Sequence, residues 1–538
     1  MLFTKIKEKV ERWHFVLLAL IFVIALAMRI IGADWGMPHN NLHPDEGFVY
    51  SPAYECALER NFEVHEYYRP NHVSIKLNTL LYIAIQDLYF APKGMEDFSV
   101  NFSHNFTIFM VASRILTAII SMGTVVFAYL ISRFWNKNVA LLATFLFAVF
   151  SSFIEHSHYL TPDITLLFFL MGVLWAALCY MKKPSKTWIF WMSFFTALAA
   201  CEKYPGLYGC AIIAVVVCVT YIKKPLMIIR DGFLAILFLV LGIMAVSPVL
   251  IVDLETVLEV MEGQNKDYHL GADGLNFGQT LIFYLKMTAV RMGLILSASS
   301  LYGIVRSFMK NTKPTIMLLA FFAYIIPIST LSVHWERYTL PMYAMGLIFA
   351  AAGVFYLIED LQKLLQKNVI VACVAYFVLL ILPVGSVAAS GLAVTSSFLA
   401  PDNRIFLQQP ISEMGISAYN TIHDCNTPLD PGGFYGAWVN FNGSPKSYKY
   451  GGNPGYVMTS SAQRDLYFEG DPEVYGWIAN FYNELDEEHQ LIAIFTAENP
   501  TYHIVEVQNI WYAARSVYRY AKGSPTGFEI RLYQLIRE

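Results

Sequence analysis

The chain alternates between long apolar segments and short polar segments that carry most of its charge. About twenty apolar residues are needed to cross a bilayer, so this pattern predicts about eleven membrane-spanning helices. They lie near residues 13–32, 107–132, 138–154, 164–181, 187–201, 205–222, 232–251, 288–306, 314–332, 338–358 and 369–392. Lys286 and Arg291 interrupt the pattern near the eighth span. Ser74–Phe90 is also apolar but contains Lys76 and Asp87, which favours a helix lying in the membrane interface.

The composition supports a membrane protein. Of 538 residues, 56% are hydrophobic and only 14% are charged, which is too apolar for a soluble chain. The net charge of -4 offers no broad basic surface, so we expect no nucleic-acid partner. Membrane lipids are the expected surroundings.

Basic residues occur in every second connecting segment. The first group, Lys5 to Arg12, precedes an apolar run without a small-residue cleavage pattern, so we expect a retained span rather than a signal peptide. Basic loops face the cytoplasm in membrane proteins, which predicts a cytoplasmic N-terminus. The first external loop, 33–106, and the segment 393–538 are then extracytoplasmic.

Two domains follow from this organisation. Residues 1–392 form a multi-span membrane domain with the loop 33–106, and residues 393–538 form an external α/β domain rich in Pro and Gly turns. Leu491–Phe495 and Thr501–Val507 are typical of strands, and Pro472–Leu485 is typical of a helix. Cys56 and Cys425 lie in polar segments, and a bridge between them stays open.

Polar residues recur beside apolar spans at four places on the same predicted side. They are His43, Asp45 and Glu46; Glu155, His156, His158 and Asp163; Glu202, Lys203 and Tyr204; and His334, Glu336 and Arg337. Each residue alone is explained by a solvated loop or an interfacial anchor. Four clusters that combine carboxylates, imidazoles and cations favour one shared polar site.

Two arginines lie within predicted spans. Arg114 is about 12 Å of helix rise inside the second span, where an unpaired Arg is costly, so we expect it to face the bundle and find an acceptor. Arg29 is nearer its span's outer end, where it can snorkel, and a structural role is expected.

One carboxylate with nearby cations suits a particular chemistry. Glycosidases need two separated carboxylates, because their leaving group requires a proton. A sugar on a lipid phosphate has a good leaving group already, which needs positive charge instead. One carboxylate base and a cationic cradle then suffice.

These residues resemble motifs of a known family. The sequence is similar to the dolichyl-phosphate-mannose protein mannosyltransferase-like glycosyltransferases of the C-type superfamily, which include bacterial aminoarabinose transferases. The matching pieces are Arg29 followed by His43-Pro44-Asp45-Glu46; Ala112-Ser113-Arg114-Ile115-Leu116 with Gly123; His156-Ser157-His158 with Asp163; Glu202-Lys203-Tyr204-Pro205-Gly206; Arg337-Tyr338-Thr339-Leu340-Pro341; and, more loosely, Tyr456-Val457-Met458-Thr459-Ser460-Ser461.

The resemblance implies an inverting transfer of a sugar, hexosyl or pentosyl, from a polyprenyl-phosphate donor to a hydroxyl of a protein, lipid or glycan. It implies a catalytic site with Asp45 as the base and Glu46 as its neighbour or as a contact to acceptor or metal. The implied substrate-binding residues are His43, His156, His158, Asp163, Lys203, Tyr204 and Arg337. A divalent metal stays an alternative, since no closed set of ligands is visible. The last segment's resemblance favours a bacterial cell membrane.

Two other functions stay open. A secondary transporter is typically built from repeat halves with charges near the bilayer midplane, and neither feature is visible. A non-catalytic scaffold that binds a partner through its external domain is compatible with the sequence.

Overall fold

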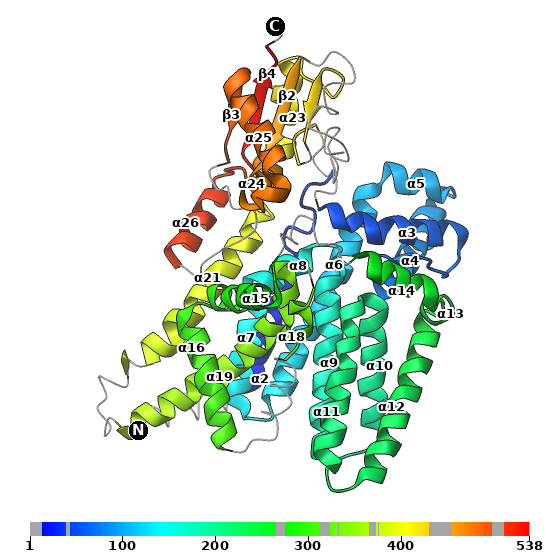
Figure 1. The fold of residues 1–538 in the computed structure, drawn as a ribbon, viewed down its shortest axis with the longest axis vertical. Helices are drawn as coiled ribbons and strands as arrows, with labels where there is room; N and C mark the ends of the chain where they lie inside the picture. Colours follow the sequence, from blue (N-terminus) through cyan, green and yellow to red (C-terminus); the bar gives the residue numbers. More distant parts are fainter. Residues whose placement is uncertain are drawn as a thin grey trace.

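The computed structural model describes residues 13–38, 43–264, 275–310, 323–331, 333–364, 373–374, 376–424, 426–429, 455–497 and 510–536. They form a bundle of long helices with a smaller sheet domain at one end (Figure 1). The predicted strand Thr501–Val507, most of the span 314–332 and Cys425 lie outside the described residues.

The bundle and its first loop are built from helices in this order. They are α2 His14–Ile30, η1 Pro44–Glu46, α3 Gly47–Glu59, α4 His72–Ile85, η2 Gln86–Phe90, η3 Ala91–Lys93, α5 Phe98–His104, α6 Phe106–Ser132, α7 Lys137–Val149, α8 Ser151–His158, α9 Pro162–Lys182, α10 Lys186–Glu202, η4 Tyr204–Tyr208, α11 Gly209–Tyr221, α12 Pro225–Val246, α13 Val249–Val252, α14 Leu254–Gln264, α15 Phe277–Met292, α16 Leu294–Met309, α18 Ile325–Ser329, η5 Glu336–Thr339, α19 Leu340–Leu364, η6 Phe377–Ile381 and α21 Leu382–Ser397.

Polar residues set several helix starts. The side chains of Asn136 and Ser185 accept hydrogen bonds from the first backbone N–H groups of α7 and α10. Pro162 and Pro225 open α9 and α12, where proline costs no hydrogen bond because those N–H groups have no partner within the helix. These caps fix where each helix begins between the polar connections and the apolar interior.

Six described helices are long and apolar enough to cross a membrane, or eight if each of two bent pairs forms one span. The predicted number was about eleven. The difference arises because α2 and α10 have only 17 residues each and 314–332 lies mostly outside the description. Most of the other predicted spans coincide with described helices. The predicted span 288–306 instead includes the end of α15 and most of α16, which are separated by the break at Gly293.

Both bends have a local cause. Between α7 and α8, Phe150 is extended and the axis turns by 50°. Arg29 is fully buried and donates 2.9 Å hydrogen bonds to the carbonyls of Phe147 and Ala148, which the break leaves without helical partners. The expected structural role of Arg29 is thus observed, whereas snorkelling is not. The second bend, 112° between α15 and α16, occurs at Gly293 with φ of 75°.

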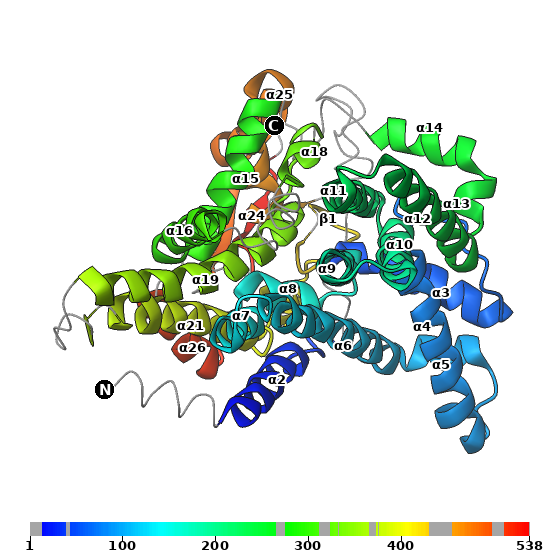
Figure 2. The same ribbon diagram turned by 90° about the horizontal axis from the view of Figure 1, so that it is seen from below.

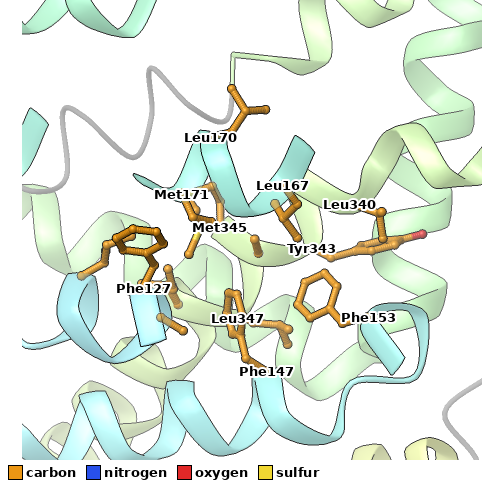
Figure 3. Packing of buried hydrophobic residues seen from close by; sticks show 14 of the residues in the cluster. Phe127, Phe147, Phe153, Leu167, Leu170, Met171, Leu340, Tyr343, Met345 and Leu347 are labelled. Carbon is orange, nitrogen blue, oxygen red and sulfur yellow. The ribbon is translucent and has the colours of Figure 1, made fainter. Parts of the chain in front are cut away.

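The core of the bundle lies where five helices meet. Phe127 of α6, Phe147 of α7, Phe153 of α8, Leu167 of α9 and Tyr343 of α19 belong to one buried cluster (Figure 3). Helices α9 and α19 are central and buried on most sides, while α12 is largely exposed. Asp163 is the second residue of α9, and Arg337 lies in η5, the short helix that leads into α19. The rigid core therefore fixes the positions of both residues.

The last part of the chain is mainly an α/β unit. Its helices are α22 Asn403–Phe406, α23 Gln408–Glu413, α24 Ser461–Glu469, α25 Pro472–Glu488 and α26 Ile510–Ala521, and its strands are β1 Thr421–His423, β2 Tyr456–Ser460, β3 Gln490–Phe495 and β4 Ile530–Gln534. The sheet order is β1-β2-β4-β3, with β1 parallel to β2 and the other pairs antiparallel. The predicted strand Leu491–Phe495 and helix Pro472–Leu485 are confirmed as β3 and α25. The predicted boundary after residue 392 falls inside α21, which continues to Ser397.

Candidate active site

Asp45 lies between two arginines just after the first long helix. One carboxylate oxygen accepts a 2.6 Å hydrogen bond from Arg337 and the other pairs with Arg69. The short helix η1 holds the residue in place, since Pro44 begins it and the backbone N–H of Asp45 donates to His43 Nδ1 at 3.2 Å. Burial alone raises the pKa of Asp45, but the charges of Arg337, His43 and Arg69 outweigh burial and hold that pKa well below its ordinary value.

Glu46 points away from Asp45 into the bundle. Both of its oxygens accept 2.8 Å hydrogen bonds from Arg114, and Oε1 also accepts from the backbone N–H of Leu160 at 3.0 Å. Arg114 donates further to the carbonyls of Ala33 and Trp35. Glu46 is therefore the acceptor that Arg114 was expected to find, and the two side chains are completely buried.

A pocket lies where α9, η4 and η5 meet. Its polar lining is formed by Asp163, Lys203, Arg337 and Tyr338, and its apolar lining includes Leu166 and Leu340. Lys203 donates to Asp163 at 2.6 Å and lies 4.8 Å from the centre of the Tyr338 ring. Arg337 both lines this pocket and binds Asp45, so it joins the pocket to the first-loop acid.

A second ion pair lies next to Arg337 in sequence. Glu336 pairs with Arg291, and it accepts a 3.1 Å hydrogen bond from Tyr343. Arg291 lies on the last turn of α15, immediately before the sharp bend into α16. Arg291, which interrupts the predicted span 288–306, is thus paired with Glu336, the residue before Arg337.

The three predicted histidines have different surroundings. His43 packs on Tyr159, with ring centres 4.3 Å apart. His156 is half-buried in the same region, with ring centres 6.2 Å from Tyr159. His158 is buried against Phe398, and each ring nitrogen lies within 2.9 Å of a backbone carbonyl. His158 therefore contacts the protein interior and not the pocket lining.

The loop 33–106 supplies Arg69 and also the partners of Glu202 and Tyr204. Arg69 lies over the Phe48 ring at 4.3 Å while it binds Asp45. Glu202 accepts a 2.9 Å hydrogen bond from the backbone N–H of Ser74, and the neighbouring Tyr204 hydroxyl donates to the Tyr67 carbonyl. These bonds fasten the loop to the residues that flank Lys203. Sequence analysis missed Arg69, because nothing in the neighbouring sequence marks one arginine of the loop 33–106 as a partner of Asp45.

Within the described ranges, no three His, Cys, Asp or Glu side chains are grouped to hold a metal ion. The charged groups around the pocket are cations paired with carboxylates. This arrangement suits an anionic ligand, which can replace a carboxylate as the partner of a cation.

Residues 61–255 match the family described as dolichyl-phosphate-mannose-protein mannosyltransferase. The match confirms the family resemblance seen in the sequence, and its range includes Arg114, Asp163 and Lys203. Asp45 and Arg337 lie outside that range. None of the curated proteins compared matches the chain by sequence.

Two solved structures are similar to the chain, the first over nearly its whole length and the second over three quarters of it. The archaeal oligosaccharyltransferase AglB from Archaeoglobus fulgidus, in complex with an inhibitory peptide and a dolichol-phosphate, has a TM-score of 0.51 at 12% identity, covering 97% of this chain and 88% of its own. ArnT from Cupriavidus metallidurans, bound to undecaprenyl phosphate, has a TM-score of 0.46 at 14% identity over 75% and 73% of the two chains. The likeness to AglB confirms the predicted C-type fold. The family match supports a membrane glycosyltransferase with a lipid-linked donor.

Proposed function

We propose that the chain is an inverting glycosyltransferase that moves one sugar from a polyprenyl-phosphate donor to an acceptor hydroxyl at the extracytoplasmic face of a cell membrane. The observation that carries this proposal is the pocket in which Lys203 and Arg337 meet Asp163, with Asp45 on the far side of Arg337. Two cations beside apolar helices fit a phosphate that carries a lipid chain.

The two cations bind and neutralise the donor phosphate. During transfer the bond between the anomeric carbon and the phosphate oxygen breaks, and the electron pair stays on the polyprenyl phosphate. Lys203 and Arg337 stabilise that developing charge, which is the largest electrostatic demand of the step. The aromatic ring of Tyr338 and the side chain of Leu340 provide apolar surface beside the phosphate.

Asp45 is the proposed base. The acceptor hydroxyl oxygen attacks the anomeric carbon from the side opposite the phosphate, and its proton passes to the Asp45 carboxylate. Without donor, Asp45 is bound to Arg337 and Arg69, so its basicity is low. A donor phosphate that takes over Arg337 removes one cation from Asp45 and raises its basicity at the moment when acceptor and donor are both bound.

The remaining predicted residues have supporting roles in this proposal. Glu46 fixes the first loop to α6 through Arg114, because both of its oxygens are already used. Tyr204 and His158 position neighbouring backbone. His43 accepts from the backbone N–H of Asp45, and His43 and His156 both lie beside the Tyr159 ring.

The decisive experiment compares Asp45→Asn with the unchanged chain, using labelled polyprenyl-phosphate sugar in reconstituted membranes. We expect transfer to fall by about 100-fold or more, because the amide cannot accept the proton. Polyprenyl phosphate should bind Asp45→Asn at least as tightly, because the phosphate no longer competes with the Asp45 carboxylate for Arg337. The matched control is Asp87→Asn, which removes a carboxylate from an exposed 2.6 Å pair with Arg60 in the same loop.

Three outcomes would contradict the proposal. Transfer at close to the unchanged rate would remove Asp45 as the base. Weaker donor binding with a lower melting temperature would indicate that Asp45 only stabilises the loop. Vectorial uptake of labelled donor without transfer would identify a transporter.

Lys203→Met tests the phosphate contact separately. A charge-assisted hydrogen bond contributes about 1.5 to 3 kcal/mol, so polyprenyl phosphate affinity should fall about 10- to 150-fold. Because Asp163 is only 5% exposed and loses its cation, the melting temperature should fall as well, so affinity is measured well below it. Unchanged affinity would exclude Lys203 from the donor site.

A further inference from the structure

Helix α26 belongs to the last part of the chain but packs on the bundle. It lies between β3 and β4 in sequence, yet it is packed against α21 rather than against the sheet. Its Ala513 is fully buried and is part of the main core cluster of the bundle, and Ser516 is buried on the same helix. Small residues on this side let α26 approach α21 closely.

The opposite side of α26 combines aromatic and basic residues. Trp511 is 82% exposed and Tyr518 is 59% exposed, and Arg515 is also exposed. Together with Lys522 these residues follow a spacing of four, three and four, which places them on one face of a helix. The Lys522 ammonium lies 4.7 Å from the Tyr518 ring centre. Residues 510–522 contain no Asp or Glu, so the only charged side chains that α26 and Lys522 contribute to this face are positive.

The position of α26 indicates which surroundings its exposed face contacts. α26 lies on the outer side of α21, at the edge of the bundle (Figure 2). Helices η6 and α21 together form a candidate membrane span, whose exposed side chains include Ile381 of η6 and Leu382 and Leu392 of α21. The surface therefore changes from purely apolar on α21 to aromatic and basic on α26. That succession is typical of the passage from acyl chains to headgroups, where Trp, Tyr and cationic side chains gather.

We propose that the exposed face of α26 is a docking surface for anionic phospholipid headgroups. Trp511 and Tyr518 lie at the boundary of the acyl chains, and Arg515 and Lys522 bind lipid phosphates. The contact goes beyond sugar transfer, because it holds the sheet domain at a fixed position over the membrane. Such a restraint keeps the domain beside the end of the bundle that carries Asp45.

The test places an environment-sensitive fluorophore at two positions of the full chain, after the exposed Cys218 and Cys373 are changed to Ser. Ala514→Cys labels the exposed side of α26, and Glu487→Cys labels the exposed side of α25 as a control. The protein is reconstituted in vesicles of equal parts phosphatidylcholine and phosphatidylglycerol. Quenching by nitroxides on the lipid acyl chains is compared with quenching by aqueous iodide.

We expect the probe on α26 to be quenched by lipid nitroxides and protected from iodide, and the probe on α25 to show the reverse. Nitroxide-labelled phosphatidylglycerol should also quench the α26 probe more than labelled phosphatidylcholine does. One cation near an anionic surface contributes about 1 kcal/mol, so Arg515→Gln should reduce that lipid preference up to about fivefold. The control Lys363→Gln, on α19, should leave the preference unchanged.

The proposal is overturned if the α26 probe is open to iodide, as the control is. Protection from both quenchers would also overturn it, because a protein partner would then cover the face. Equal quenching by both lipids would exclude anionic headgroups as the ligand. None of these results depends on sugar transfer, so they are separate from the test of Asp45.

Discussion

Arg114 and Glu46 form the most enclosed ion pair of the first loop, with both side chains fully buried. Removing one partner leaves a buried charge without compensation, which costs about 3 to 5 kcal/mol. Arg114→Leu should therefore lower the melting temperature strongly in detergent. Adding Glu46→Gln removes the stranded charge but keeps an oxygen for the Leu160 N–H, so the double variant should melt higher than Arg114→Leu alone. If it melts no higher, the lost stability comes from the carbonyl contacts of Arg114 instead.

His72, the first residue of α4, connects the first loop to Ser247 at the end of α12. Its Nε2 lies 2.7 Å from the Glu66 carbonyl and its Nδ1 faces the Ser247 hydroxyl. A neutral ring that donates to Glu66 and accepts from Ser247 satisfies both contacts without placing a charge in the buried site. Burial lowers the pKa of His72 to about 4, against an ordinary value of 6.5.

This shift predicts a loss of stability in acid. Between pH 6.5 and 4 the unfolded chain binds a proton at His72 that the folded chain does not, so the free energy of unfolding falls as pH falls. The full loss for this group is about 3 kcal/mol. Melting curves of the purified protein across this range should show the decline, and His72→Gln should flatten it. An equally steep decline in the variant would assign the effect to other groups.

At the scale of residues, sequence identified polar side chains but not their partners. Asp45, Asp163, Lys203 and Arg337 were all expected at one site, because each stands beside an apolar span. Their pairing was not predictable, since contacts such as that of Asp45 with Arg337 join residues 292 positions apart. The buried acceptor of Arg114 was unidentified for the same reason.

At the scale of elements, close backbone contact between α16 and α19 fixes the relative positions of Arg291 and Glu336, which precede these two helices. A Cβ at Gly353 would lie 1.8 Å from the Ser299 carbonyl oxygen, so only glycine fits there. Gly353→Ala should force the helices apart and destabilise the protein by about 1 to 3 kcal/mol. The matched control is Gly232→Ala on α12, where no atom lies within 4 Å of the added carbon. Similar melting temperatures for the two variants would contradict the close contact.

The same contact has a consequence for function. Helix α16 follows Arg291 and α19 follows Arg337, so displacement of one helix against the other separates Arg291 from Glu336. We expect Gly353→Ala to weaken donor binding as well as stability. Hydropathy found both helices, because a run of apolar residues is a local signal. It did not find the bend at Gly293 or the glycine contact, which depend on packing between distant segments.

At the scale of the whole molecule, the sheet domain and the helices α3, α4 and α5 lie toward the same end of the bundle, and the turn between α11 and α12 lies at the other end (Figure 1). The sequence predicts this arrangement from its basic loops alone, because cytoplasmic loops collect Lys and Arg. It does not predict that α26 leaves the sheet to pack on α21, since both are short amphipathic or apolar segments with many alternative partners.

The topology can be tested on intact cells that express the chain with its exposed native cysteines changed to Ser. A membrane-impermeant thiol reagent should label Glu96→Cys, between η3 and α5, and Glu487→Cys, on α25, because both side chains are exposed at the end where Asp45 lies. It should not label Lys183→Cys, which is equally exposed but follows α9 in a basic loop. After the membrane is permeabilised, all three should react. Labelling of Lys183→Cys in intact cells would place the pocket on the cytoplasmic side, where a donor presented at the outer surface cannot reach Lys203 and Arg337.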